Sequence, residues 1–298
     1  MKKSTKFFVF GGLICMLAGT IIMLITGAAG GLNMFRDMAW DLAGRRMVIT
    51  GDLMDDWEDG DFSYFAGTKE FSVSDNHIST INITVEGGEL NILEGKGDQI
   101  KIYTENGFGT QYAMDNGALT IKEENDWFGF VNDHDVTVYL PKNMTFESIN
   151  LAVGGGEVEA STLDAKEVTM NIGAGEAYVQ NLIAHELIAN VGAGEINIDH
   201  GDIAGDVEVN VGMGELEFDG YAGGDLDLKC GMGDIQFLTR GMRYEDFNYD
   251  IKCAAGNIDL NGSSYSGMAL KRTIDNGSSR NANIDCGMGN ITFEFYRQ

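Results

Sequence analysis

Apolar and polar residues alternate along much of this chain with a period of two. Val207, Val209 and Val211 alternate with polar residues, the glycines of 212–214 interrupt the pattern, and alternation resumes over 215–218. Strict alternation is typical of a β-strand that buries one face. We therefore predict a strand, a glycine corner and a second, shorter strand here.

The same pattern returns at a nearly constant interval. Five close copies of a Gly-x-Gly-acid phrase occupy 153–157, 172–176, 191–195, 211–215 and 230–234. The last glycines of successive copies are separated by 19, 19, 20 and 19 residues, and looser copies lie at 85–89, 253–257 and 286–290. A fixed period near 20 residues is typical of stacked repeats, in which each unit buries its apolar face against its neighbours.

These features predict an all-β fold: a single-sheet-stack β-solenoid, similar to a β-helix, of ~20-residue repeats preceded by one transmembrane α-helix. The corner glycines would supply positive φ and allow backbones to approach closely. An antiparallel sandwich of hairpins is the alternative, since glycine corners also suit hairpins. In the solenoid, one inward ladder would contain Val153, Ile172, Val191, Val211, Cys230, Cys253 and Cys286.

Less regular segments flank the repeats. Upstream alternation predicts wider opening coils with strands at 100–103, 118–121 and 136–140 and loops at 107–116 and 123–135. We expect surface loops at 238–245 and 261–281. We also expect the strand 293–297 to close one end of the stack, because an open sheet edge invites unwanted pairing.

The N-terminal segment differs in character. Residues 7–26 carry no charge, and at ~1.5 Å rise per residue a helix of this length spans the ~30 Å core of a bilayer. Lys2, Lys3 and Lys6 precede it, which favours a cytoplasmic N-terminus and an extracellular C-terminal domain. The alternative is a cleaved signal peptide, with 26–28 as the cleavage site.

Three segments follow from these patterns. Residues 1–30 would form a cytoplasmic tip and transmembrane helix, 31–75 a juxtamembrane helix and acidic linker, and 76–298 the solenoid, regular from about 149. The expected location is the cell membrane, with a single pass.

Charge narrows the range of partners. The net charge is −26, and residues 1–46 contribute +6 − 2 = +4, so the remainder carries −26 − 4 = −30. Such a body repels phosphate backbones, which excludes nucleic acid as a partner. Cys230, Cys253 and Cys286 occupy an apolar repeat position without zinc-type spacing, and we interpret them as buried packing residues.

The candidate functional residues are the acids that follow the corners: Glu157, Glu176, Glu195, Glu215 and Asp234. In a solenoid they would stack in a column, at a cost of ~0.9 kcal/mol per neighbouring pair in water. Ca²⁺ could offset this repulsion. Alternatively, the side chains splay into water or accept hydrogen bonds from corner amides. No catalytic residue and no other cofactor or metal site is predicted.

A second outward column would contain amides and lysines. Its members are Asn171, Asn190 and Asn210, continued by Lys229 and Lys252. Stacked asparagine amides can hydrogen-bond along a sheet. We interpret this column as structural.

The run 81–92, the strand 116–121, the strand 136–141 and the glycine-rich repeat together resemble the bacterial putative-adhesin family. The likeness covers about residues 76–298. It implies a β-solenoid ectodomain at the cell envelope behind an N-terminal anchor, in a family of largely unknown function. Some relatives are encoded beside envelope-stress systems, which implies an accessory role. The resemblance brings no catalytic residues.

We therefore expect a non-enzymatic, membrane-anchored, extracytoplasmic protein for adhesion, cell-envelope interaction or an envelope-stress accessory role. Its partner would be the cell wall or an envelope protein. One alternative is a structural surface protein that polymerises end to end. Another is a carbohydrate-active β-helix enzyme, but such an enzyme needs clustered basic residues for an acidic substrate, and the chain has 20 Lys and Arg against 46 Asp and Glu.

Overall fold

The structure, a computed structural model, describes residues 63–64, 69–73, 78–105, 110–123, 135–142 and 144–296. The predicted transmembrane helix and juxtamembrane helix lie outside these residues. Within the described part, no helix is long and apolar enough to cross a membrane. The described part is almost entirely β-structure, which confirms the predicted class.

The strands follow one another along the chain with few other elements. The first eight are β1 (Ser63–Tyr64), β2 (Lys69–Val73), β3 (Thr80–Val85), β4 (Glu89–Gly95), β5 (Ile100–Glu105), β6 (Thr110–Asp115), β7 (Ala118–Glu123) and β8 (Asp135–Pro141). The central nine are β9 (Phe146–Val153), β10 (Glu157–Ala160), β11 (Leu163–Ile172), β12 (Glu176–Val191), β13 (Glu195–Ile203), β14 (Val207–Val211), β15 (Glu215–Ala222), β16 (Leu226–Cys230) and β17 (Asp234–Arg240). After the short 3-10 helix η1 (Tyr244–Asp246) come β18 (Asn248–Cys253), β19 (Asn257–Leu260), β20 (Ser263–Ser266), β21 (Leu270–Ile274), β22 (Asn281–Cys286) and β23 (Asn290–Tyr296).

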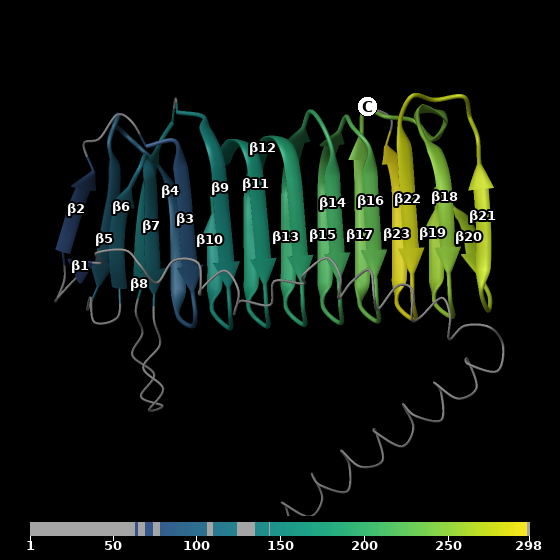
Figure 1. The fold of residues 1–298 in the computed structure, drawn as a ribbon, viewed down its shortest axis with the longest axis horizontal. Coiled ribbons are helices and arrows are strands. Elements are labelled where there is room, and N and C mark those ends of the chain that lie inside the picture. The colour runs from purple at the N-terminus through teal and green to yellow at the C-terminus, as the bar shows by residue number, and fades with distance from the viewer. Residues whose placement is uncertain are drawn as a thin grey trace, which may run out of the picture.

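Strand pairing arranges these strands in two long rows, and the strands of each row lie side by side along the long axis of the molecule (Figure 1). Face I runs β1-β6-β7-β3-β9-β11-β12-β14-β16-β22-β18-β21. Face II runs β2-β5-β8-β4-β10-β12-β13-β15-β17-β23-β19-β20. The long strand β12 belongs to both, its C-terminal half to face I and its N-terminal half to face II.

Each central coil contributes one strand to each face, joined at a glycine corner. Neighbouring coils pair in parallel with an offset of one repeat, so that Val158 lies opposite Ala177 and Val209 opposite Leu228. The inward ladder predicted from the sequence is buried throughout. The returns also pair, since 163–165, 182–184, 201–203 and 220–222 lie in register as a third, short parallel strip. The parallel pairing excludes the sandwich of hairpins for the central repeats.

The corner glycines are needed for close approach of the backbone. A Cβ on Gly194 would lie 2.1 Å from the carbonyl oxygen of Gly175, and one on Gly214 would lie 2.1 Å from that of Gly194. The expectation of positive φ at the corners is wrong for the five close copies, and Gly88, in the early copy, has a φ of 108°. Stacked corners therefore require glycine because a side chain would separate adjacent coils.

The order of the coils departs from chain order at the C-terminal end. The last coil, β22 and β23, lies between the coil β16–β17 and the coil β18–β19 (Figure 1). Cys286 therefore pairs with both Cys230 and Cys253. The prediction that strand 293–297 closes the stack is wrong. The predicted loop 261–281 instead contains β20 and β21, which pair antiparallel with β19 and β18 and cover that end.

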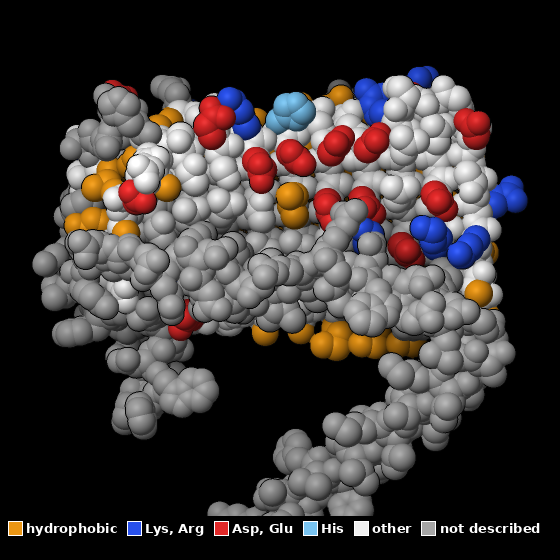
Figure 2. Space-filling model, viewed as in Figure 1, with side chains coloured by type: hydrophobic (Ala, Val, Ile, Leu, Met, Phe, Trp, Pro, Cys, Tyr) orange, Lys and Arg blue, Asp and Glu red, His pale blue; other side chains and the backbone are white. Residues whose placement is uncertain are grey.

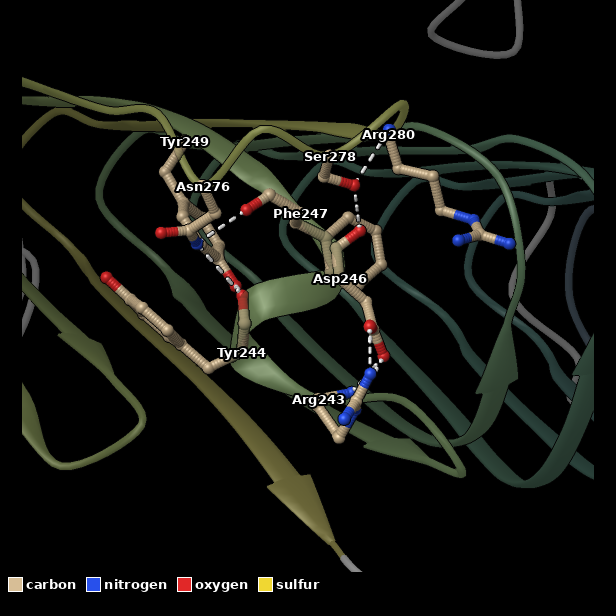
Figure 3. Close-up of polar contacts among 8 residues, drawn as sticks. All are labelled: Arg243, Tyr244, Asp246, Phe247, Tyr249, Asn276, Ser278 and Arg280. Atoms are coloured by element: carbon tan, nitrogen blue, oxygen red, sulfur yellow. Dashed lines mark hydrogen bonds and ion pairs between the residues drawn. The ribbon is translucent and has the colours of Figure 1, made fainter.

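Polar contacts hold the connections around the inserted coil (Figure 3). The guanidinium of Arg280 donates to the carbonyl of Gly223, 57 residues earlier in the chain. The hydroxyl of Ser278 donates to the carbonyl of Asp246, whose carboxylate forms an ion pair with Arg243 at 3.0 Å. Segment 275–280 is thus fixed against the β17–β18 connection, which positions the start of β22.

The N-terminal end is also irregular. Strands β7 and β8 pair in parallel with β3 and β4, as the predicted opening coils require. Strands β5 and β6 then pair antiparallel with β8 and β7. The predicted loop 107–116 is wrong in large part, because β6 occupies 110–115; residues 124–134 of the second predicted loop lie outside the described part.

Candidate functional site

The five predicted carboxylates lie in one column on face II, at the first residue of β10, β12, β13, β15 and β17. Backbone register places Glu157 opposite Glu176, Glu176 opposite Glu195, Glu195 opposite Glu215 and Glu215 opposite Asp234. The column extends to Glu89 at one end and to Asn290 and Asn257 at the other. We call this set, from Glu89 to Asp234, the acidic column.

The carboxylates of the acidic column repel one another. Partial burial raises the pKa of the Glu195 carboxyl, and the neighbouring charges of Glu215 and Glu176 raise it further. Adjacent coils in a parallel sheet are about 4.8 Å apart, well within the range of an unscreened Coulomb interaction. The column is therefore a continuous strip of negative potential.

Side-chain amides relieve part of this charge. The amide of Gln236 donates to Glu215 Oε1 at 3.2 Å, and that of Asn290 donates to Asp234 Oδ2 at 3.1 Å. The backbone amides at the corners are engaged elsewhere, as when the N–H of Glu195 donates to the carbonyl of Gly175 at 3.0 Å. The alternative in which corner amides bind the carboxylates does not match this pattern.

A row of apolar side chains lies beside the acidic column, at the middle residue of each Gly-x-Gly corner. Corner hydrogen bonds order it as Ala174, Ala193, Met213, Met232 and Met288. The methionines are exposed, Met213 by 62% and Met232 by 54%. Figure 2 shows hydrophobic side chains along the lower edge of the molecule, where the corners of Figure 1 lie.

Part of this row and part of the acidic column line an open, shallow groove of about 460 Å³. The lining side chains are Ala174, Ala193, Met213 and Met232 from the row and Glu176, Glu195, Glu215 and Asp234 from the column. The groove runs from Ala174 and Glu176 across several coils to Asn290. Flexible thioethers beside fixed charges suit contact with a partner surface rather than with one small molecule. We call this groove the corner edge.

Among the described residues, no group of three or more histidine, cysteine, aspartate or glutamate side chains is close enough to hold a metal ion. The Ca²⁺ site in the acidic column stays a prediction. The three repeat cysteines are buried and form no disulfide. Burial raises the pKa of the Cys253 thiol to about 11, so it is a packing group rather than a nucleophile.

The predicted asparagine column lies on face I. Asn190 donates to Asn171 at 2.8 Å, and Asn210 donates to Asn190 at 3.0 Å. Lys229 follows in register, but Asp285 of the inserted coil separates it from Lys252. These contacts join coils, which supports the structural interpretation.

The sequence reasoning missed a second site near the N-terminal end of face II. A hollow of about 910 Å³ is lined by Lys101, Tyr103 and Tyr139 and by residues 94–99, which are the end of β4 and the connection from β4 to β5. It arises from the antiparallel pairing of β5 with β8, which no repeat predicts. The sequence signal that could have indicated this hollow is a tyrosine at an outward position in each of two strands, Tyr103 and Tyr139. Lys96 and Lys101 precede the first of these tyrosines.

Comparisons with known proteins bear on the fold and family. Residues 78–280 match the family described as Toastrack DUF4097, which confirms the resemblance to the putative-adhesin family. No curated protein matches the chain.

Several solved structures are similar to the chain. A putative cell adhesion protein from Clostridium sporogenes is 17% identical over 77% of this chain and 100% of its own, with a TM-score of 0.33. A putative adhesin from Parabacteroides distasonis is 16% identical over 78% and 97%, with a TM-score of 0.44. A putative lipid binding protein from the same species is 14% identical over 77% and 98%, with a TM-score of 0.39.

Proposed function

Because the chain belongs to the Toastrack DUF4097 family, we propose that it is a non-enzymatic protein that presents a β-solenoid outside the cell membrane for adhesion or another contact with the cell envelope. Its N-terminal helix would anchor it by a single pass, with the solenoid extracellular. An accessory role in envelope stress is compatible with the same arrangement.

The corner edge is the observation that carries this proposal. It is long, open and built on backbone hydrogen bonds between coils, such as those from Met213 to Gly192 and from Met232 to Gly212, both 2.7 Å. A rigid, regular surface of this kind suits an extended partner. Enzyme sites, in contrast, usually lie in concave pockets with a few convergent polar groups.

Charge indicates the chemistry of the partner. The acidic column would attract cationic groups of a wall polymer or an envelope protein and raise the rate of encounter. The adjacent methionines would then bury apolar surface, which contributes about 25 cal/mol per Å². The partner would therefore combine positive charge with apolar groups.

The two alternative functions are less well supported. End-to-end polymerisation needs exposed, unblocked sheet edges, whereas β20 and β21 close one end with antiparallel pairing. Outward cations such as Lys271 and Arg272 on β21 are a known protection of edge strands. Chromatography of the detergent-solubilised chain should give a monomer, and a ladder of oligomers would favour polymerisation.

The proposal is tested by retention of the full chain on purified cell-envelope fractions. The variant Glu176→Gln/Glu195→Gln/Glu215→Gln removes three charges from the acidic column. Its matched control, Glu167→Gln/Glu186→Gln/Asp202→Asn, removes three exposed charges elsewhere. We expect about tenfold weaker retention for the first variant and little change for the control. Equal effects, or retention of neither wild type nor variants, would contradict the proposal.

A further inference from the structure

The hollow near the N-terminal end of face II has the size and composition of a ligand site. Its volume of about 910 Å³ falls within the usual range for small-molecule pockets, about 300–1,000 Å³. A second hollow of about 460 Å³ shares residues 95–98 and adds Pro141, Lys142 and Met144. The connection from β4 to β5 therefore lines two recesses.

Two tyrosines form the floor of the larger hollow. Tyr139 of β8 pairs with Leu93 of β4 on one side and with Lys101 of β5 on the other. Tyr103 lies two residues further along β5, on the same outward face, opposite Thr137. Both rings are half-buried, so each keeps a side open to the hollow.

The rim of this hollow is polar and carries charges of both signs. Lys96, Gln99 and Lys101 contribute donors around the tyrosines. Two carboxylates, Glu94 and Asp98, line the hollow beside the two lysines, whereas the whole chain has more than twice as many acidic as basic residues. Lys142 neutralises the carboxylate of Glu94 at 3.0 Å.

We infer that this hollow binds an oligosaccharide. The C–H faces of two sugar rings would lie on Tyr103 and Tyr139, and hydroxyl or acidic substituents would accept hydrogen bonds from Lys96, Gln99 and Lys101. Aromatic floors with a few placed polar groups are the usual composition of such pockets. The inference deepens the proposed function, because it names a glycan of the envelope as one class of ligand.

The hollow is built for binding rather than for cleavage. Glycosidases need a carboxylic acid with a raised pKa to protonate the leaving oxygen. The hydrogen bond from Lys142 instead lowers the pKa of Glu94, which keeps this carboxyl ionised. A bound saccharide should therefore remain intact.

The experiment is calorimetric titration of the full chain in detergent with two probes, chitotriose and tri-galacturonic acid. We expect both to bind, Tyr139→Ala to weaken both about tenfold, and Tyr139→Phe to retain binding because the ring remains. Tyr178→Ala is the matched control, since Tyr178 is exposed on the same face outside the hollow. Lys101→Met should weaken the acidic trimer more than the neutral one.

Two outcomes would overturn the inference: neither trimer binds the wild type, or Tyr139→Ala behaves like Tyr178→Ala. Chromatography of the probes after incubation should recover intact trimers, and shorter products would contradict the binding role. These results are separable from the proposed function. Retention on envelope fractions through the corner edge can succeed when the trimers fail to bind.

Discussion

Removing one charge from the middle of the acidic column should stabilise the protein. Glu195 lies between Glu176 and Glu215, so Glu195→Gln removes two repulsive interactions while keeping the size and polarity of the side chain. Most exposed substitutions change stability by less than about 0.5 kcal/mol. A clear gain is therefore diagnostic of repulsion in the column.

The size of the gain follows from the coil spacing. Two unit charges about 4.8 Å apart in water repel by about 0.9 kcal/mol, so two neighbours contribute about 1.7 kcal/mol at low salt. A Debye length of about 8 Å at physiological ionic strength reduces this to about 1 kcal/mol. For a domain of this size that corresponds to about 2–4 °C in Tm.

The assay is thermal denaturation of Glu195→Gln and wild type at low and high salt. The difference in Tm should be largest at low salt and should shrink at about 0.5 M, where charges are screened. Asp202→Asn is the control, because Asp202 pairs with Ile183 and Tyr221 rather than with acids. A lower Tm for Glu195→Gln than for wild type would refute this reasoning. So would an increase in Tm that Asp202→Asn shows equally, or one that does not depend on salt concentration.

The pH dependence has a definite sign. The pKa of Glu195 is raised in the folded state, so wild-type stability is full below the ordinary pKa and falls as pH rises through the raised value. Glu195→Gln cannot ionise and should lack this loss. The two proteins should therefore converge in acid and diverge towards neutral pH.

Three further predictions concern the scaffold. Burial raises the pKa of the Glu123 carboxyl to about 7, so the folded protein is fully stable below about pH 4.5 and loses stability as pH rises to 7. Glu123→Gln cannot ionise and should be about 2–3 kcal/mol more stable than wild type at pH 8 in urea titrations. The two proteins should have the same stability near pH 4. Gly194→Ala should lower the urea midpoint by the equivalent of about 2–4 kcal/mol, because its Cβ would meet the carbonyl of Gly175, whereas Gly97→Ala, with open space around its Cβ, should be neutral. Truncation after residue 280 should expose the coil β18–β19 to limited proteolysis while the coils before β16 stay protected; uniform protection would contradict the coil order.

The repeat could be predicted because its signals agree at two levels. Alternation determines which residues point inward, and the Gly-x-Gly-acid phrase determines the register between coils. A shift of one residue would turn Val191 and Val211 outward, so Glu195 and Glu215 are forced opposite each other. The acidic column can therefore be predicted from the sequence alone.

The tyrosine hollow could not be predicted in the same way. It depends on antiparallel pairing of β5 with β8, two strands that are separated by the 29 residues 106–134. Tyr103 and Tyr139 lie outside the regular repeats, so no periodicity in the sequence relates the two positions. Sites outside a repeat need the tertiary pairing, whereas sites within it need the period alone.

The position of the last coil was unpredictable for a different reason. Cys230, Cys253 and Cys286 fill equivalent core positions in three coils. Core packing therefore does not determine whether the coil of Cys253 or the coil of Cys286 lies next to the coil of Cys230. The choice is made at the edge: β20 and β21 pair antiparallel with β19 and β18 and occupy the outer side of that coil. A final parallel coil can then pair on the inner side alone, where Phe293 also meets Phe237 edge to face at 5.5 Å. An apparent surface insert thus decides the order of the core, because it blocks the edge that the last coil would otherwise use.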